Sequence, residues 1–479
     1  MKPGKAIYAE PEVSEQIQDF ERRHDAFAIR EGGVSLWRLM RFEASVQLQN
    51  LELRRSPIPR SQLLLSLPRA AWQFATARRG YRYIGKTSNS GLRDKRNGRY
   101  RDIYFDDLID AVPGGALFSS LDAIGFDHNS RNAHRQPVFD DTAVVVGSAV
   151  LGRVLGRRSP SEASARLAQR ISEGLGLDGF SASRVQRKYD VFRYRAALYR
   201  HVLKRFGVRS VLAANTGLFP LIAATRALGI PYIEIQHGDF GVHHPESLPV
   251  SAFETGVEGL LLPDRLAVFG QRDIERLSGT ALGELGRLRA IGAPAIAAGR
   301  ALREARFHTD PAMPVITFTS QGFAREQVDR FITEFLAASS EPMRFIVRLH
   351  PGYDGDGANY RAIADIDARL IVMPGDAAPS THEVIAQSDL HVSISSTCHY
   401  DSLGIGTPTA VLGLPGHASM AELVETGMAR HVDTPEQLAL MVRQRNWGLV
   451  TAEQSSYFFR PGYIENMLEL LAEWDVGTQ

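Results

Sequence analysis

The amino-acid sequence predicts an α/β protein with two Rossmann-like domains, each built around a doubly wound parallel sheet. Three observations carry this prediction. The chain has 479 residues, more than one ordinary core accommodates, so two domains are expected. Short apolar runs alternate with segments of helical periodicity from residue 101 onward. The stretch 209–241 reads as strand, turn, helix and strand, a βαβ unit that requires parallel strands.

The order of these elements predicts three parts. Residues 1–100 form an accessory N-terminal segment, partly helical and basic, with a helix over Ser35–Leu53. Residues 101–255 form the first Rossmann-like domain and residues 256–479 the second, and the strand ends of the two domains are expected to face a common cleft. Further elements expected from the pattern are strands at Asp102–Leu108, Thr142–Val150 and Pro314–Gly322, a long helix over Ser181–Gly207, and a strand that ends at His350.

Composition narrows the class of protein. Hydrophobic residues make up 44% and charged residues 23%, ordinary globular values that argue against global disorder. The single cysteine, Cys398, excludes an internal disulfide and a thiolate zinc cluster and fits a reducing cytosol. No stretch approaches about 20 uncharged apolar residues, and the N-terminus has no apolar signal. We therefore expect a cytoplasmic protein, soluble or peripheral on the inner face of the plasma membrane.

Positive charge is concentrated between Arg54 and Arg101, where 13 basic residues stand against one acid, Asp94. Inside it, "QLLLSLPRAAWQFATARRGYRYIG" (62–85) mixes arginines with apolar side chains in the manner of an interfacial helix on anionic lipid. The apolar members are Leu63, Leu64, Leu65, Leu67, Trp72, Phe74, Tyr81 and Tyr83. A solvated basic face packed on its own domain explains the segment equally well. No nucleic-acid motif accompanies the charge, so no nucleic-acid partner is expected.

The first candidate site residue is His350, at the end of the buried run "FIVRLHP" (345–351). Pro351 ends the strand, so the imidazole stands at a carboxyl end, where open α/β sheets bind ligands. Arg348, two residues earlier on the same face, offers a second phosphate donor. A purely structural strand terminator remains the alternative.

The second candidate is "SDLHVSISSTCHYDSLGIGTPTAVLG" (388–413). Ser395, Ser396 and Thr397 supply hydroxyls at a predicted strand-to-helix turn, where free amides and the helix dipole favour an anion. Asp401 follows one helical turn later and is placed to accept hydrogen bonds from ribose hydroxyls. An ordinary helix cap with a solvated carboxylate is the alternative.

The third candidate is "YIEIQHGDFGVHHPES" (232–247). Gly238 permits a turn that leaves His237 and Asp239 at the strand end, where either side chain can take the proton of an acceptor hydroxyl. His243 and His244 could support a metal. Without an acidic cluster at ligand spacing, we favour hydrogen-bonding roles and expect no metal.

Three of these motifs, "RLHPGY", "SISSTCHYDSLGIGTP" and "IQHGDFG", resemble GT-B glycosyltransferases that build bacterial capsules and lipopolysaccharides. The His-Pro and Ser-Ser/Thr pair is similar to that of sialyl-, polysialyl- and Kdo-transferases, which use CMP-activated sugars. The resemblance, which covers roughly Val211 to Gly416, implies that His350, Ser395, Ser396 and Thr397 bind the nucleotide phosphate and that Asp401 binds ribose. The His-Gly pair also resembles that of wall teichoic acid glycerophosphotransferases, which implies that His237 is the base.

The predicted function is accordingly a metal-independent GT-B glycosyltransferase without a cofactor. It would move a sugar from a nucleotide donor, with a CMP-sugar favoured over a UDP- or GDP-sugar, to a growing capsule or lipopolysaccharide glycan. The expected partners are the nucleotide sugar, an oligosaccharide or lipid-linked acceptor, and an anionic membrane surface at Arg54–Arg101. The alternatives are a CDP-polyol phosphotransferase of teichoic-acid type, a sugar-nucleotide epimerase, and a non-catalytic scaffold of a polysaccharide assembly complex.

Overall fold

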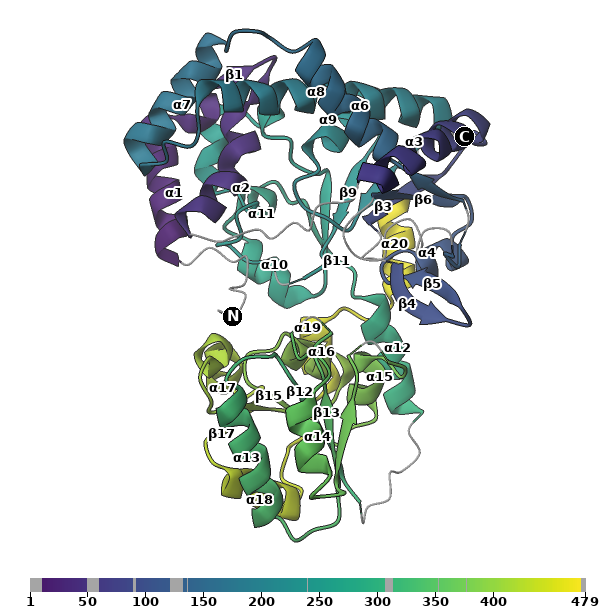
Figure 1. Cartoon of the computed structure of the whole chain (residues 1–479), viewed down its shortest axis with the longest axis vertical. Helices are drawn as coiled ribbons and strands as arrows, with labels where there is room; N and C mark the ends of the chain where they lie inside the picture. Colours follow the sequence, from purple (N-terminus) through teal and green to yellow (C-terminus); the bar gives the residue numbers. More distant parts are fainter. Residues whose placement is uncertain are drawn as a thin grey trace. The chain divides into compact units, whose positions relative to one another are not determined.

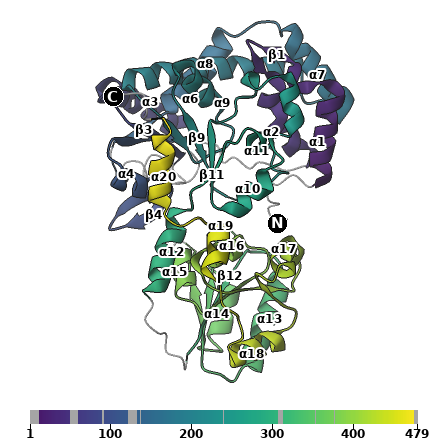
Figure 2. The same cartoon turned by 180° about the vertical axis from the view of Figure 1, so that it is seen from behind.

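The computed structural model describes residues 11–49, 60–88, 92–120, 132–135, 137–238, 240–305, 313–351, 353–375 and 377–474. The chain divides into two compact units, which are considered separately (Figure 1; Figure 2). Each unit contains one wholly parallel sheet, of seven strands in one and six in the other as far as the chain is described, together with helices. The predicted α/β class with two doubly wound domains is confirmed.

The larger unit consists of described residues within 5–268, 273–290 and 464–479. Its sheet has the order β11-β10-β9-β8-β3-β6-β7. The strands are β3 (Tyr83–Ser88), β6 (Gly115–Ser120), β7 (Val138–Asp140), β8 (Val211–Ala213), β9 (Tyr232–Ile235), β10 (Arg265–Val268) and β11 (Leu288–Ala290). Two short antiparallel ladders accompany it, β1 (Arg30–Glu31) with β2 (Val34–Ser35) and β4 (Leu92–Arg96) with β5 (Arg99–Asp102).

Helices accompany this sheet, and all of those given next except α4 and α20 share one hydrophobic core with it. They are α1 (Pro11–His24), α2 (Leu36–Leu48), α3 (Arg60–Thr76), α4 (Asp106–Ala111), α6 (Thr142–Val154), α7 (Glu162–Leu175), α8 (Ala182–Phe206), α9 (Phe219–Leu228), α11 (Ala281–Glu284) and α20 (Tyr463–Ala472), while α10 (Gln271–Leu277) contains residues of both units. The long helix α8 was predicted correctly. Its N-cap Ser181 accepts a hydrogen bond from Arg184 N, and it ends at Gly207, whose φ of 61° favours glycine.

The described residues 11–49, 60–88 and 92–100 are part of this unit and do not form an accessory segment. β3 lies in the middle of the sheet, where Ile84 is in register with Val211 of β8 and Ala116 of β6. The predicted boundary at 255 also differs from the observed one. β10 pairs with β9 in parallel and β11 with β10, so the sheet of the larger unit continues to residue 290.

Two predicted strands are wrong. The segment from Thr142 is the helix α6, because its buried residues Val144, Ser148 and Gly152 recur every four positions and form a helical stripe. The strand predicted at Asp102–Leu108 is replaced by the end of β5, a turn and the start of α4. The Asp102 carboxylate makes that turn by accepting hydrogen bonds from Tyr104 N (2.9 Å) and Phe105 N (3.0 Å).

The smaller unit consists mainly of described residues within 291–463. Its sheet has the order β14-β13-β12-β15-β16-β17. The strands are β12 (Val315–Thr319), β13 (Arg344–Arg348), β14 (Leu370–Met373), β15 (Leu390–Ser393), β16 (Thr409–Leu412) and β17 (Arg430–Val432). The helices are α12 (Pro294–Glu304), α13 (Arg325–Ala338), α14 (Ala358–Ala364), α15 (Thr381–Ala386), α16 (Cys398–Ile405), α17 (Ala421–Glu425), α18 (Pro435–Gln444) and α19 (Ala452–Phe458).

Helices cover both faces of this smaller sheet. Along β16, Ala410 and Leu412 belong to the core formed with α13 and α18, while Val411 belongs to the core formed with α12, α15, α16 and α19. Both faces of the strand are therefore buried, so a ligand can reach this sheet only at the strand ends and their loops. No helix among the described residues is both long enough and apolar enough to cross a membrane.

Candidate functional site

The strand order of the smaller unit places a topological switch point between β12 and β15. From β12 the chain proceeds outward through β13 to β14, and from β15 it proceeds in the other direction through β16 to β17. Because the strands are parallel, their carboxyl ends lie along one edge. Open α/β sheets bind ligands outside the carboxyl ends at such a point.

The loops at this edge contact one another. Gln321, which follows β12, accepts a hydrogen bond from Ser395 N (2.9 Å), and its amide nitrogen donates one to Ser395 Oγ (3.2 Å). A Cβ on Gly322 would lie 2.4 Å from Tyr353, and one on Gly416 would lie 3.7 Å from Ser395 Oγ. The loops after β12, β13, β15 and β16 therefore form one cluster.

The serine and threonine hydroxyls lie at the turn from β15 to α16, as the sequence predicts. Ser396 Oγ accepts a hydrogen bond from Cys398 N (3.2 Å). Thr397 is the N-cap residue of α16, is exposed, and forms no side-chain capping bond. Asp401 lies in the first turn of the helix, with Oδ2 3.4 Å from His382 Nε2. The arrangement groups the three hydroxyls of Ser395, Ser396 and Thr397 with one carboxylate. The first N–H groups of α16 are engaged within the turn, since Cys398 N donates to Ser396 Oγ, His399 N to Ser396 O and Tyr400 N to Thr397 O.

His350 lies two residues beyond β13 and is half-buried. Its ring stacks on Tyr353 with 4.3 Å between centroids, and its backbone N–H donates to Asp354. Burial lowers the pKa of His350, an effect that the Asp354 carboxylate opposes. The ring is therefore neutral at pH 7 and can donate one hydrogen bond to a phosphate oxygen without bringing a charge.

Arg348 is only 2% exposed and takes part in holding the loop that follows β14. Its guanidinium donates to Gly375 O (3.1 Å), Ala377 O (2.7 Å) and Thr381 Oγ1 (3.3 Å). These contacts fix the chain that leads into α15. Direct contact of Arg348 with phosphate stays a prediction.

Two polar residues of this edge were not found by reading the sequence, His382 and Gln321. α15 begins with a capping box in which Ser380 Oγ accepts from Glu383 N and the Glu383 carboxylate accepts from Ser380 N. The "STHE" pattern of that box places a helix start, and with it His382, at the edge where parallel strands end. No comparable signal marks Gln321, because its partner Ser395 is 74 residues away.

A layer of buried polar side chains lies beneath these loops. His391 joins Thr319 Oγ1 through Nε2 (2.9 Å) and Thr409 Oγ1 through Nδ1 (2.8 Å), and His399 Nδ1 is 2.6 Å from the same Thr409 hydroxyl. Burial lowers the pKa of His399 to about 3 and that of His391 well below its usual value. Both rings stay neutral and tie β12, β15 and α16 together.

The predicted base, His237, belongs to the larger unit. It follows β9, its side chain is exposed, and its carbonyl accepts a hydrogen bond from Tyr104 OH (3.3 Å). The preceding Gln236 donates to Gly238 O (3.0 Å). Desolvation by the surrounding chain lowers the pKa of His237 below its ordinary value, so the ring is neutral at pH 7 and can accept a proton. Asp239 lies outside the described residues.

The same loop also contains His244, whose role is structural. His244 Nδ1 accepts from Glu246 N (3.1 Å), and its ring lies 4.3 Å from that of Phe240. Burial, reinforced by the nearby His237, lowers the pKa of His244 to about 3. Among the described residues, no three His, Cys, Asp or Glu side chains are grouped to hold a metal ion.

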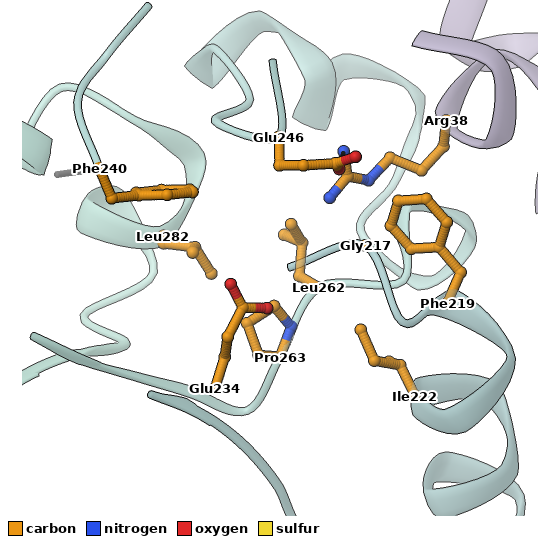
Figure 3. A pocket seen from close by; sticks show the side chains of 10 residues that line it. All are labelled: Arg38, Gly217, Phe219, Ile222, Glu234, Phe240, Glu246, Leu262, Pro263 and Leu282. Carbon is orange, nitrogen blue, oxygen red and sulfur yellow. Dashed lines mark hydrogen bonds and ion pairs between the residues drawn. The ribbon is translucent and has the colours of Figure 1, made fainter. Parts of the chain in front are cut away.

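Phe240 and Glu246 of this loop line a small cavity (Figure 3). Arg38 of α2 donates to Glu246 Oε2 (2.7 Å) and to Leu260 O (3.0 Å). Glu234 of β9, only 6% exposed, directs its carboxyl into the cavity (Figure 3). Burial raises the pKa of Glu234 to about 8, with a further upward contribution from Glu246 and a downward one from Arg38. The remaining lining is Gly217, Phe219, Ile222, Phe240, Leu262, Pro263 and Leu282.

Comparisons with known proteins give structural likeness only. No protein-family model matches the chain, and no curated protein matches it. The chain is similar to UDP-GlcNAc 2-epimerase from Neisseria meningitidis bound to UDP-GlcNAc (12% identity, TM-score 0.49, 82% of this chain and 99% of that chain). It is also similar to Acinetobacter baumannii MurG (12%, 0.45, 82% and 99%) and to the wall teichoic acid polymerase TagF (11%, 0.43, 90% and 97%). Similarity of this degree assigns no activity, substrate or partner to this chain.

Proposed function

We propose that this protein is a glycosyltransferase of GT-B type that moves a sugar from a nucleotide donor to a growing capsule or lipopolysaccharide glycan. The observation that carries the proposal is the grouping of Ser395, Ser396, Thr397 and Asp401 at the start of α16, in a loop cluster that also includes the loop of His350. A phosphate needs converging donors, and a ribose needs an acceptor beside it. Both are present at the switch point.

The donor-side roles follow from these positions. The hydroxyls of Ser395, Ser396 and Thr397 hold the phosphate at the positive end of the α16 dipole, and His350 donates one further hydrogen bond. Asp401 accepts hydrogen bonds from the ribose hydroxyls. Hydrogen-bond donors fixed around a departing phosphate stabilise its developing charge, so the proposal requires no metal.

His237 is the base in this proposal. A neutral imidazole with a lowered pKa accepts the proton that the acceptor hydroxyl loses as it attacks the sugar carbon. Asp239 is the second candidate for this role. The acceptor is an oligosaccharide or a lipid-linked glycan, and we place the reaction in the cytoplasm at the inner face of the membrane. A CMP-sugar is the favoured donor, on the strength of the His-Pro and Ser-Ser/Thr motifs.

His350→Ala is expected to weaken nucleotide binding about 10- to 100-fold, because it removes one hydrogen bond to a charged phosphate, about 1.5–3 kcal/mol. Isothermal titration with CMP, CDP, UDP and GDP measures this and identifies the preferred base. His431→Ala is the matched control, since His431 is exposed on the strand β17. Equal binding by the wild type and His350→Ala contradicts the phosphate role.

The second candidate function is transfer of a polyol phosphate from a CDP-linked donor. The exposed His237 followed by Gly238 at the end of β9 favours it, since the base would be the same. Product analysis separates the two functions, because only the phosphotransferase leaves phosphate in the polymer and releases CMP from a CDP donor. Incubation of donor without acceptor tests for epimerase activity, and failure to bind any nucleotide points to a non-catalytic scaffold.

A further inference from the structure

Three helices of the larger unit form a continuous layer at its surface. α3 contacts α6, and α6 contacts α8 (Figure 1; Figure 2). Arg205 of α8 donates to Ala75 O near the end of α3 (3.1 Å), which joins the outer two helices as well. The exposed side chains of α3, α6 and α8 therefore lie on helices that contact one another.

Large apolar side chains are exposed on this layer. Trp72 on α3 is 70% exposed, and Val150 (55%), Val154 (70%) and Leu155 (59%) lie at the end of α6. Val150 and Val154 are four residues apart on a helix and share one face. Val150, Val154 and Leu155 group at the end of α6, whereas Trp72 lies towards its start, because the neighbouring Gln73 bonds to Val138 O and Asp140 N. Single exposed apolar residues are common, but a group of three at one helix end is of the kind that meets a partner or a membrane.

The same layer carries positive charge almost without acid. α3, α6 and α8 together contain one acidic residue, Asp190, which is buried and bonded to Arg193 (2.9 Å). Other basic side chains are exposed and form no ion pair with a described acid; they are Arg78, Arg79, Arg153, Arg158, Arg187, Arg200 and Lys204. The charge concentration seen in the sequence at Arg54–Arg101 thus extends onto α6 and α8.

The structure also changes which aromatic residues face outward. Of the aromatic residues in the stretch 62–85, Trp72 alone is exposed. Tyr83 is fully buried and donates to Val112 O (2.9 Å), Phe74 lies 5.8 Å from the Phe206 ring, and Tyr81 packs edge-on against Phe139. The side chains of Leu63, Leu64 and Leu65 lie outside the described residues. Among the described side chains, Trp72 and the residues at the end of α6 are the large apolar groups exposed on this layer.

We propose that the exposed face of α3, α6 and α8 docks on an anionic lipid bilayer, with Trp72, Val154 and Leu155 entering the headgroup region and the arginines and lysines binding the lipid phosphates. A soluble polyanion would pair with the basic side chains but would not bury the exposed Trp, Val and Leu side chains. A bilayer with anionic headgroups matches both properties. The proposal rests on the membrane location given in the proposed function, but its test can fail separately from the glycosyltransferase assignment, because binding to vesicles is measured without substrate.

Vesicle co-sedimentation of the full chain tests this proposal, with vesicles of phosphatidylglycerol and phosphatidylcholine compared with phosphatidylcholine alone. The wild type is expected to bind the anionic vesicles and to be released by salt. Arg153→Gln/Arg158→Gln/Arg200→Gln/Lys204→Gln should weaken binding about 100-fold or more, since each surface charge contributes several-fold. Trp72→Ser/Val154→Ser/Leu155→Ser should also weaken it. All substituted side chains are exposed, so folding should be kept, and circular dichroism checks this.

A matched control changes exposed residues of the smaller unit, Arg330→Gln/Arg443→Gln/Ile366→Ser/Leu449→Ser, and should bind as the wild type does. A wild type that stays in the supernatant overturns the proposal. A second result would also overturn it. If Trp72→Ser/Val154→Ser/Leu155→Ser binds the vesicles like the wild type, and inorganic polyphosphate displaces both proteins, the surface binds soluble polyanions instead.

Discussion

Replacement of His237 by alanine is expected to lower kcat for sugar transfer by about 100- to 10,000-fold, the usual contribution of a general base. The side chain is exposed at the end of β9, and its lowered pKa keeps the ring neutral and ready to accept a proton at pH 7. Nucleotide binding should be unchanged, because the groups proposed to bind phosphate belong to the smaller unit. Steady-state kinetics together with titration of the nucleotide measures both quantities.

The pH profile makes this test specific. In the wild type, kcat/KM should fall on the acid side only when His237 is protonated, and its lowered pKa moves that fall below the ordinary value of about 6.5. His243→Ala, an exposed histidine on the same loop, is the control and should keep full activity. Loss of activity in Asp239→Asn with retention in His237→Ala would transfer the role of base to Asp239.

The sequence predicted the positions of the candidate residues in the fold better than the contacts that support them. His350, the Ser395–Thr397 turn and Asp401 each follow a short apolar strand, so a pattern of a few residues is enough to place them at a carboxyl edge. Arg348 shares that pattern, but its side chain is buried against the loop after β14. Whether the Arg348 side chain faces a ligand or the protein depends on the loop that contains Gly375 and Ala377, which is distant in the sequence. A local sequence pattern around Arg348 does not include that loop.

The fold was predicted where strands and helices alternate regularly and was missed where tertiary packing decides. β3 is a central strand, yet its sequence "YIGKTS" contains a lysine, Lys86, that a buried strand disfavours. The structure accommodates this charge through an ion pair with Asp141 (2.9 Å), 55 positions away in the sequence. The valine-rich start of α6 looks like a strand by propensity, and only its packing on α8 makes it a helix.

The second large effect is expected at Arg38, the cation between two buried glutamates. Arg38→Ala should lower the free energy of unfolding by about 3–5 kcal/mol at pH 7, because Glu246 loses its 2.7 Å partner and remains buried. The loop that begins with His237 should loosen too, since Arg38 and Arg41 hold its far end through Glu246, Pro245 O and Ser247 O. Chemical denaturation and hydrogen exchange over 236–247 measure the two effects.

A neutral pair separates the charge from the packing. Arg38→Met/Glu246→Gln fills similar volume without buried charge and should recover most of the lost stability. Failure to recover would mean that the contact of Arg38 with Leu260 O, and not the ion pair, is what matters.

The pH dependence of stability gives an independent reading of the same cluster through Glu234. Burial raises the pKa of Glu234 to about 8, so between about 4.3 and 8 the folded chain holds a proton that the unfolded chain has released. Glu234 therefore makes the free energy of unfolding fall as pH rises through that range, by up to about 1.4 kcal/mol per pH unit. Glu234→Gln should flatten this slope and be more stable than the wild type at pH 8 but not at pH 4.

In Arg38→Ala the pKa of Glu234 rises further, because the attraction that lowers it is gone. The slope should then persist to higher pH, and an identical slope in both proteins would show that Arg38 does not act on Glu234.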